Sequence, residues 1–106
     1  MSTIRLSVPA SAKAGEIVEI KTLIQHPMES GFRRGSRGEL LERDIITRFE
    51  CRFEGTLVFA ADFFPAVAAN PFLTFHLKAQ QSGTLYFTWT DQDGQTWSDE
   101  ASLSVT

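Results

Sequence analysis

Several features that would mark a particular class of protein are missing from this 106-residue sequence. Its one cysteine cannot form an internal disulfide, and together with only two histidines it falls short of a Cys/His zinc set. No apolar run approaches the roughly 20 residues that a membrane helix needs. The net charge of −3 creates no basic field for nucleic acid or for an acidic membrane. We therefore expect no metal, no cofactor, no nucleic acid and no membrane among its ligands and partners.

Motifs of export and catalysis are missing as well. The segment from Met1 to Arg5 is not a basic leader followed by an apolar stretch of about 7–15 residues, so we expect no signal peptide. The run Gly35-Ser36-Arg37-Gly38 does not have the spacing of a nucleophile elbow. There is no phosphate loop and no dinucleotide fingerprint. Taken alone, these absences favour a cytoplasmic protein that is not an enzyme.

Alternation of apolar and polar residues with a period of two is the main pattern that is present. It predicts strands at residues 5–8, 17–26, 45–53, 56–59, 72–78, 85–90 and 96–105. About seven antiparallel strands with turns every 8–12 residues are typical of an immunoglobulin-like β-sandwich. We therefore expect an all-β fold in which residues 1–106 form a single domain.

The segment from Glu29 to Arg43 does not follow the strand pattern. It holds three glycines and the closely spaced arginines Arg33, Arg34 and Arg37, in a chain that is acidic overall. The glycines predict a long loop, and arginine side chains can bind a small anion or the acidic surface of a partner enzyme. Two alternatives stay open: a solvated loop whose charges are offset by its own glutamates, and two turns of helix at residues 39–46.

Cys51 is the candidate for thiol chemistry. A reactive thiol needs exposure and nearby positive charge. In a strand, however, Cys51 shares one face with Phe49 and Phe53, while Arg52 points to the other face. We therefore expect a buried and inert cysteine, with a thiol enzyme that uses Cys51 as the alternative.

Nine phenylalanines are many for a core of this size. The strand that begins at Phe72 carries apolar residues on both faces, and a two-layer sandwich can cover only one of them. We therefore predict that a partner protein covers an apolar surface. The candidate interface residues are Phe64, Phe72 and Phe75, with His26, Pro27 and Met28 at the rim. Pairing of two copies of this chain through the same surface is the alternative.

Five stretches of the sequence, taken together, resemble one known family. They are Lys13–Ile24, His26–Gly31, Phe49–Gly55, Ala69–Phe72 and Phe87–Asp91, in this order and without large gaps. The fragments His-Pro-Met-Glu, Ala-Asn-Pro and Thr-Trp-Thr-Asp within them make the combination specific. Over nearly its whole length, the chain resembles the SoxZ family of bacterial sulphur-oxidation proteins.

The resemblance implies an immunoglobulin-like sandwich, in agreement with the strand pattern. It also implies a non-catalytic subunit that forms a heterodimer with a SoxY-type carrier. The cysteine of that carrier lies on a flexible, Gly-rich C-terminal tail and carries thiosulfate-derived sulphur intermediates. The complex would meet the other sulphur-oxidation enzymes transiently. This sequence ends in a predicted strand without such a tail, so we do not expect this chain to have the carrier role.

The resemblance also changes the expected location. The pathway is periplasmic, and SoxZ-type subunits commonly lack an export signal of their own. The resemblance therefore implies a periplasmic protein that is exported bound to a partner with a signal peptide.

Overall fold

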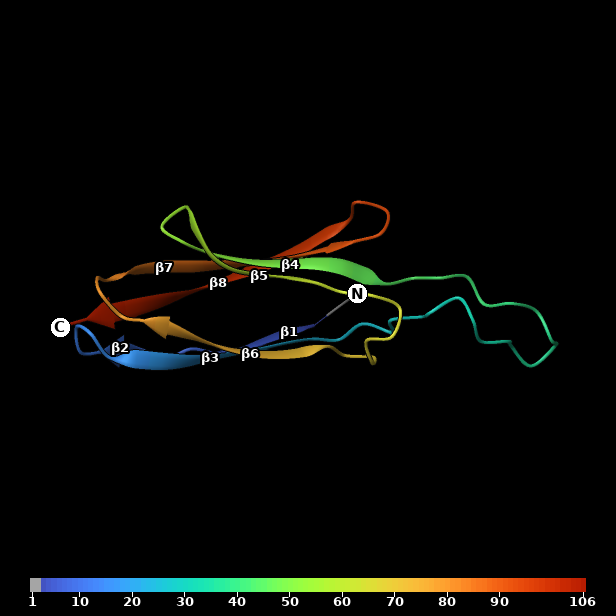
Figure 1. The fold of residues 1–106 in the computed structure, drawn as a ribbon, viewed down its shortest axis with the longest axis horizontal. Helices are drawn as coiled ribbons and strands as arrows, with labels where there is room; N and C mark the ends of the chain where they lie inside the picture. Colours follow the sequence, from blue (N-terminus) through green and yellow to red (C-terminus); the bar gives the residue numbers. More distant parts are fainter. Residues whose placement is uncertain (1–2) are drawn as a thin grey trace.

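The computed structural model describes residues 3–106, which form eight β-strands in two packed sheets (Figure 1). The smaller sheet has three strands, in the order β1 (Ile4–Ser7), β3 (Ile17–Ile24) and β6 (Phe72–Lys78). The larger sheet has five, in the order β2 (Ser11–Ala12), β8 (Thr96–Val105), β7 (Gly83–Asp91), β4 (Ile46–Phe53) and β5 (Thr56–Asp62). The predicted all-β, immunoglobulin-like sandwich is confirmed.

Several details differ from the predicted strands, among them the ends of β5, which runs to Asp62, and of β7, which begins at Gly83. The two-residue strand β2 pairs with β8 in parallel, whereas all other pairs are antiparallel. Two residues are too few to produce a detectable alternation, so β2 was not predictable. In addition, β3 ends at Ile24 and not near His26. At His26 the backbone leaves the sheet, because its N–H donates to Asn70 Oδ1 at 2.9 Å and its C=O accepts from Asn70 N–H at 2.8 Å.

The core lies between the sheets and is built around Phe49 on β4. The Phe49 ring lies 5.0 Å from the Trp89 ring and 6.1 Å from the Phe75 ring, and is fully buried. Phe59 on β5 stacks on Phe75 on β6, with a centroid distance of 4.3 Å and an interplanar angle of 4°. Because β5 and β6 belong to different sheets, this ring pair joins the two layers at their edges.

Residues 29–44 form a long, irregular hairpin, which we call the arm. It projects beyond the end of the two sheets and contributes to the elongated shape of the molecule, 58 × 21 × 20 Å (Figure 1). At its base, Glu29 and Asp44 exchange two backbone hydrogen bonds of 2.8 Å. Further out, the Leu41 N–H donates to the Arg33 C=O at 2.9 Å. The helix considered at residues 39–46 is therefore wrong, because the backbone bonds of the arm run across the hairpin and not along it.

Glycines allow the two strands of the arm to approach and turn. Gly31 has a φ of +86°, and a Cβ added to it would lie 3.0 Å from Arg43 Cβ on the opposite strand. Gly38 at the tip has a φ of +80°. Other side chains rarely adopt this left-handed conformation, so the glycines that predict a loop in fact permit a tight hairpin.

Candidate partner-binding surface

The structure divides the predicted interface residues between surface and core. Phe64 and Phe72 are 64% and 57% exposed. Phe75, by contrast, is buried in the core, so its placement on the interface is wrong. The reason is the period of two: Phe72 and Phe75 are three residues apart on β6, and side chains at that spacing point to opposite faces of a sheet.

Two of the three predicted rim residues are also buried. Pro27 is exposed, but His26 and Met28 lie under the base of the arm. His26 Nδ1 accepts the Met28 N–H at 3.0 Å, and His26 Nε2 lies 3.6 Å from Asp44 Oδ1. The Met28 sulfur accepts the Ile46 N–H at 3.2 Å. Both side chains therefore accept hydrogen bonds from backbone N–H groups inside the protein. The prediction that they lie at the rim of an interface is wrong, because both are buried.

A second set of bonds fixes the arm to the turn between β7 and β8. Gln92 Nε2 donates to the Arg43 C=O at 2.6 Å, and Gln92 Oε1 accepts from Arg43 Nε at 3.0 Å. Asp91 Oδ1 closes the same turn by accepting the N–H groups of Asp93 and Gln95. Three of the fragments behind the family resemblance, around His26, Asn70 and Asp91, thus contribute to the base of the arm.

The outer face of the three-stranded sheet carries a shallow hollow beside Phe72. Its volume is about 210 Å³, and β1, β3 and the first residue of β6 form its walls. Leu23 lies opposite Phe72 in the β3–β6 register, so the two apolar side chains are direct neighbours. Arg5 and Lys21 border the hollow. An apolar side chain with an acidic neighbour on a partner would match this surface.

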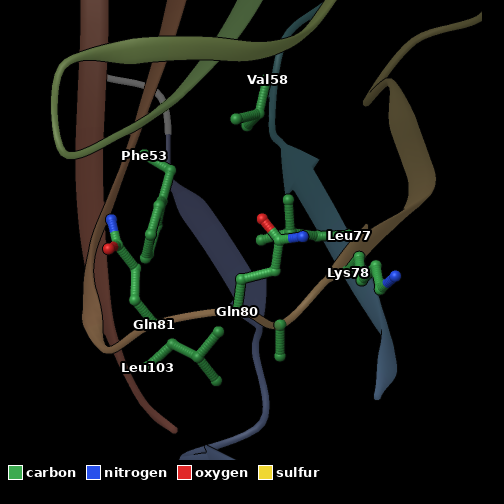
Figure 2. Close-up of a pocket in the computed structure, with 8 residues that line it drawn as sticks. Phe53, Val58, Leu77, Lys78, Gln80, Gln81 and Leu103 are labelled. Atoms are coloured by element: carbon green, nitrogen blue, oxygen red, sulfur yellow. The ribbon is translucent and has the colours of Figure 1, made fainter. Parts of the chain in front are cut away.

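A crevice opens between the edge strands β5 and β6. It has a volume of about 250 Å³. Figure 2 shows Phe53 and Val58 on one side and Leu77 on the other, with the side chain of Gln80 between them. The lining offers one ionisable group, Lys78, and neither a carboxylate nor a thiol. The crevice is smaller than the 300 Å³ or more that is typical of small-molecule sites, and its lining holds no acid–base pair.

The three predicted arginines do not converge on one anion site. Arg33 is bound by Glu29, with its Nε 3.1 Å from Glu29 Oε2, and this contact lowers the pKa of the Glu29 carboxyl group. Arg34 Nη1 donates to the Gly38 C=O at 2.8 Å and stabilises the tip of the hairpin. Arg37 is exposed. The contact of these arginines with an anion or an enzyme stays a prediction.

Cys51 is buried in the core, as predicted. Burial raises the pKa of its thiol from 9.0 to about 12, because the thiolate would lose its hydration. Within residues 3–106, no group of three or more His, Cys, Asp or Glu side chains could hold a metal ion. The same residues include no helix with the length and apolarity to cross a membrane.

Sequence reasoning missed two exposed apolar residues on the arm. Phe32 is 81% exposed and Leu40 is 58% exposed. Single apolar residues among glycines and charges give no periodic signal, and their common position becomes visible only when the hairpin register is known. That register pairs Arg34 with Leu40.

Comparison with known proteins gives one family and one fold. A family model described as sulphur oxidation protein SoxZ matches residues 4–102. A search of curated proteins found no match. Among solved structures, a superoxide reductase (neelaredoxin) from Ignicoccus hospitalis is 21% identical, with a TM-score of 0.73 over 98% of this chain and 80% of that chain. The sulphur carrier protein SoxY from Chlorobium limicola f thiosulfatophilum is 15% identical, with a TM-score of 0.69 over 97% of this chain and 78% of that chain. At these identities, the two structures establish the fold alone.

Proposed function

This chain belongs to the SoxZ family of sulphur oxidation proteins, and from this we propose that it is the non-catalytic subunit of a sulphur-carrier complex. In this role it binds a SoxY-type subunit, whose cysteine carries the sulphur intermediates, and presents that subunit to the enzymes of the pathway. The match over residues 4–102 is the observation on which the proposal rests.

The state of the thiol supports a role without covalent chemistry. The thiolate is the form of cysteine that attacks sulphur or carbon, and a pKa of about 12 leaves it almost unpopulated at neutral pH. Cys51 also lies in the core between the sheets, where a substrate has no access. In the proposed complex, the reactive thiol is therefore supplied by the partner.

The exposed phenylalanines support an interface at the segment that crosses from one sheet to the other. Phe64 follows β5 and Phe72 begins β6, so they lie at the two ends of this crossing. Covering each half-exposed ring contributes roughly 2–3 kcal/mol, at about 25 cal/mol per Å² of apolar surface, before the cost of association is subtracted. We place the partner against Phe72 and the adjoining hollow, with Phe64 and Pro27 nearer its border.

The location of the complex is part of the proposal. We place it in the periplasm and propose that this chain is exported while bound to a partner that has a signal peptide. A fold with one cysteine needs no disulfide formation, so it can fold before export and stay intact in an oxidising compartment.

One co-expression experiment tests the interface and the export together. The chain is produced with a tagged SoxY-type partner that bears the only added export signal, and both proteins are measured in the cytoplasmic and periplasmic fractions. Phe72→Asp replaces an exposed ring by a charge, and we expect at least about tenfold less co-purification and retention in the cytoplasm.

Ile17→Asp is the matched control, because Ile17 is exposed on the same sheet, at the opposite end of the β3–β6 register. Circular dichroism and the unfolding temperature establish that both variants are folded. Equal co-purification of wild type, Phe72→Asp and Ile17→Asp would exclude this sheet face as the interface. A wild-type chain that binds no partner would overturn the proposed function itself.

A further inference from the structure

The arm has two chemically different faces. The pairing of Arg34 with Leu40, and the bond from Leu41 N–H to Arg33 C=O, place Phe32 opposite Glu42. Because side chains alternate along paired strands, Phe32, Arg34, Leu40 and Glu42 share one face, which we call the apolar face. Arg33 lies on the other face, where it is bound by Glu29.

This apolar face is not covered by its own chain. Phe32 and Leu40 are the two apolar side chains on it, and both are exposed. They belong to the hairpin that projects beyond the end of the sheets (Figure 1). They are diagonal neighbours in the hairpin register, close enough to form one patch. The hairpin projects from the end of the molecule, so the sheets of its own chain do not cover this patch, and another chain is the candidate to cover it.

The charges along the arm identify that chain. The outer half, residues 33–39, has three arginines against one glutamate, a net charge of +2. The half next to the sheets, residues 29–32 and 40–44, has Glu29, Glu42 and Asp44 against Arg43, a net charge of −2. The arm is neutral as a whole but is basic at its tip and acidic at its base. An antiparallel copy of the same arm sets the net positive outer half of each arm against the net negative inner half of the other.

We infer that two copies of this chain associate through their arms, antiparallel and face to face, about a two-fold axis. In a two-fold interface, each contact occurs twice. The tip of one arm lies over the base of the other, so that Arg34 of each copy approaches Glu42 of the second copy. Phe32 and Leu40 of both copies meet near the axis and are removed from water. The sheets stay at opposite ends of the pair and do not collide.

The size of the face sets the strength of the association. Two exposed apolar side chains per copy provide much less than the ~800 Å² that each partner buries in a standard interface. We therefore expect a reversible dimer with a dissociation constant of roughly 10–1,000 µM. The charge pairs are exposed, so high salt weakens the dimer.

Charge reversal tests the inference on the full chain without any partner. Sedimentation equilibrium from about 10 µM to about 1 mM measures association of the wild type, Arg34→Glu and Glu42→Arg. Each reversal changes two contacts per dimer, and we expect association to weaken about tenfold or more. An equimolar mixture of the two variants restores it, because the reversed tip of one then meets the reversed base of the other.

Matched controls separate the arm from general charge effects. Lys13→Glu and Glu100→Arg make the same changes in net charge on exposed residues that lie outside the arm and outside the hollow beside Phe72, and we expect them to leave association unchanged. Glu42→Arg keeps every hydrogen bond described above for the arm, so it remains informative if loss of the bond from Arg34 to Gly38 loosens the tip. Phe32→Ser abolishes association with no change in charge.

Three outcomes overturn the inference. They are a chain that stays monomeric at about 1 mM, a dimer that the control reversals weaken as much as the arm variants do, and a mixture that shows no restoration. Arm variants that lose binding to a SoxY-type partner, while the wild type alone is monomeric, would instead assign the apolar face to that partner. Phe72→Asp is expected to keep self-association. A failed prediction of self-association is therefore distinct from a failed prediction of partner binding.

Discussion

At the scale of single residues, Cys51 shows how neighbours control reactivity. The same thiol in an exposed position would titrate near its ordinary pKa, but the core raises this pKa to about 12. At pH 8 this leaves roughly one molecule in ten thousand as thiolate. The arginine next in sequence has no influence, because Arg52 lies on the opposite face of β4 and bonds to Glu50.

We expect Cys51 to be protected from a thiol-specific reagent at pH 8 until the protein unfolds. The labelling rate should rise by at least about a hundredfold at denaturant concentrations where circular dichroism reports unfolding, since only the open chain exposes the thiol. Mass spectrometry after timed quenching measures the labelling rate of Cys51. A Ser98→Cys variant, with the new thiol on an exposed strand position, provides the fast reference. Native labelling of Cys51 as fast as this reference would contradict its burial.

Single residues also show where reasoning from a sequence reaches its limit. Alternation along residues 72–78 predicts the strand correctly, and it already separates Phe72 from Phe75. Which of the two faces looks outward depends on the other sheet, which the pattern of one strand does not contain. His26 and Met28 were unpredictable for another reason: their partners, Trp97, Asp44 and Ile46, are distant in sequence.

At the scale of elements, the arm depends on a small number of bonds at its base. Gln92 reaches across from the β7–β8 turn and binds Arg43 through both atoms of its amide. Its Oε1 is also 3.4 Å from the N atom of Ile45, the residue before β4. The orientation of the arm relative to the sheets is therefore controlled by a side chain from a third element.

We expect Gln92→Ala to loosen the arm without unfolding the sandwich. Loss of about one net hydrogen bond, worth about 1 kcal/mol, should speed amide hydrogen exchange at Glu29 and Asp44 by about fivefold. Exchange in β3 and β4 should be unchanged. Gln95→Ala is the matched control, because the described bond of Gln95 in this turn uses its backbone N–H and not its side chain. Equal exchange rates in the two variants would show that Gln92 does not hold the arm.

The strands and the arm were not equally predictable. Strands buried on one face, such as β3 and β7, repeat the inside–outside alternation over eight or nine residues and are evident in the sequence. Neither face of the arm packs on the core, so its sequence shows no regular alternation of apolar and polar residues. It is held by cross-strand backbone bonds, by the left-handed Gly31 and Gly38, and by Gln92, and each of these requires the three-dimensional register.

At the scale of the whole molecule, ion pairs link stability to pH. Hydrogen bonds from Arg48 and then Arg52 lower the pKa of Glu50, and Arg33 lowers the pKa of Glu29. A carboxyl group whose pKa is lowered by folding stabilises the folded state at pH values above its unfolded pKa, near 4.5. That contribution is lost as the pH falls through the lower folded pKa.

We expect the unfolding temperature to fall steadily between pH 5 and pH 3, and less steeply in high salt, which screens these exposed pairs. Arg48→Met removes the arginine that lowers the pKa of Glu50 most, and the variant should therefore lose less stability over this range than the wild type. Differential scanning calorimetry at fixed ionic strength measures the effect. A variant with the same pH dependence as the wild type would show that the pair with Glu50 contributes nothing to acid sensitivity.

The length of the arm gives this small molecule a mechanical property. Each strand of the hairpin has about eight residues, which at ~3.3 Å per residue is roughly 26 Å of reach. A pivot of only about 10° at the base, where Gln92 holds Arg43, would sweep the tip through roughly 4–5 Å. A small rotation at the base of the arm would therefore be amplified into a displacement of several ångströms at its tip.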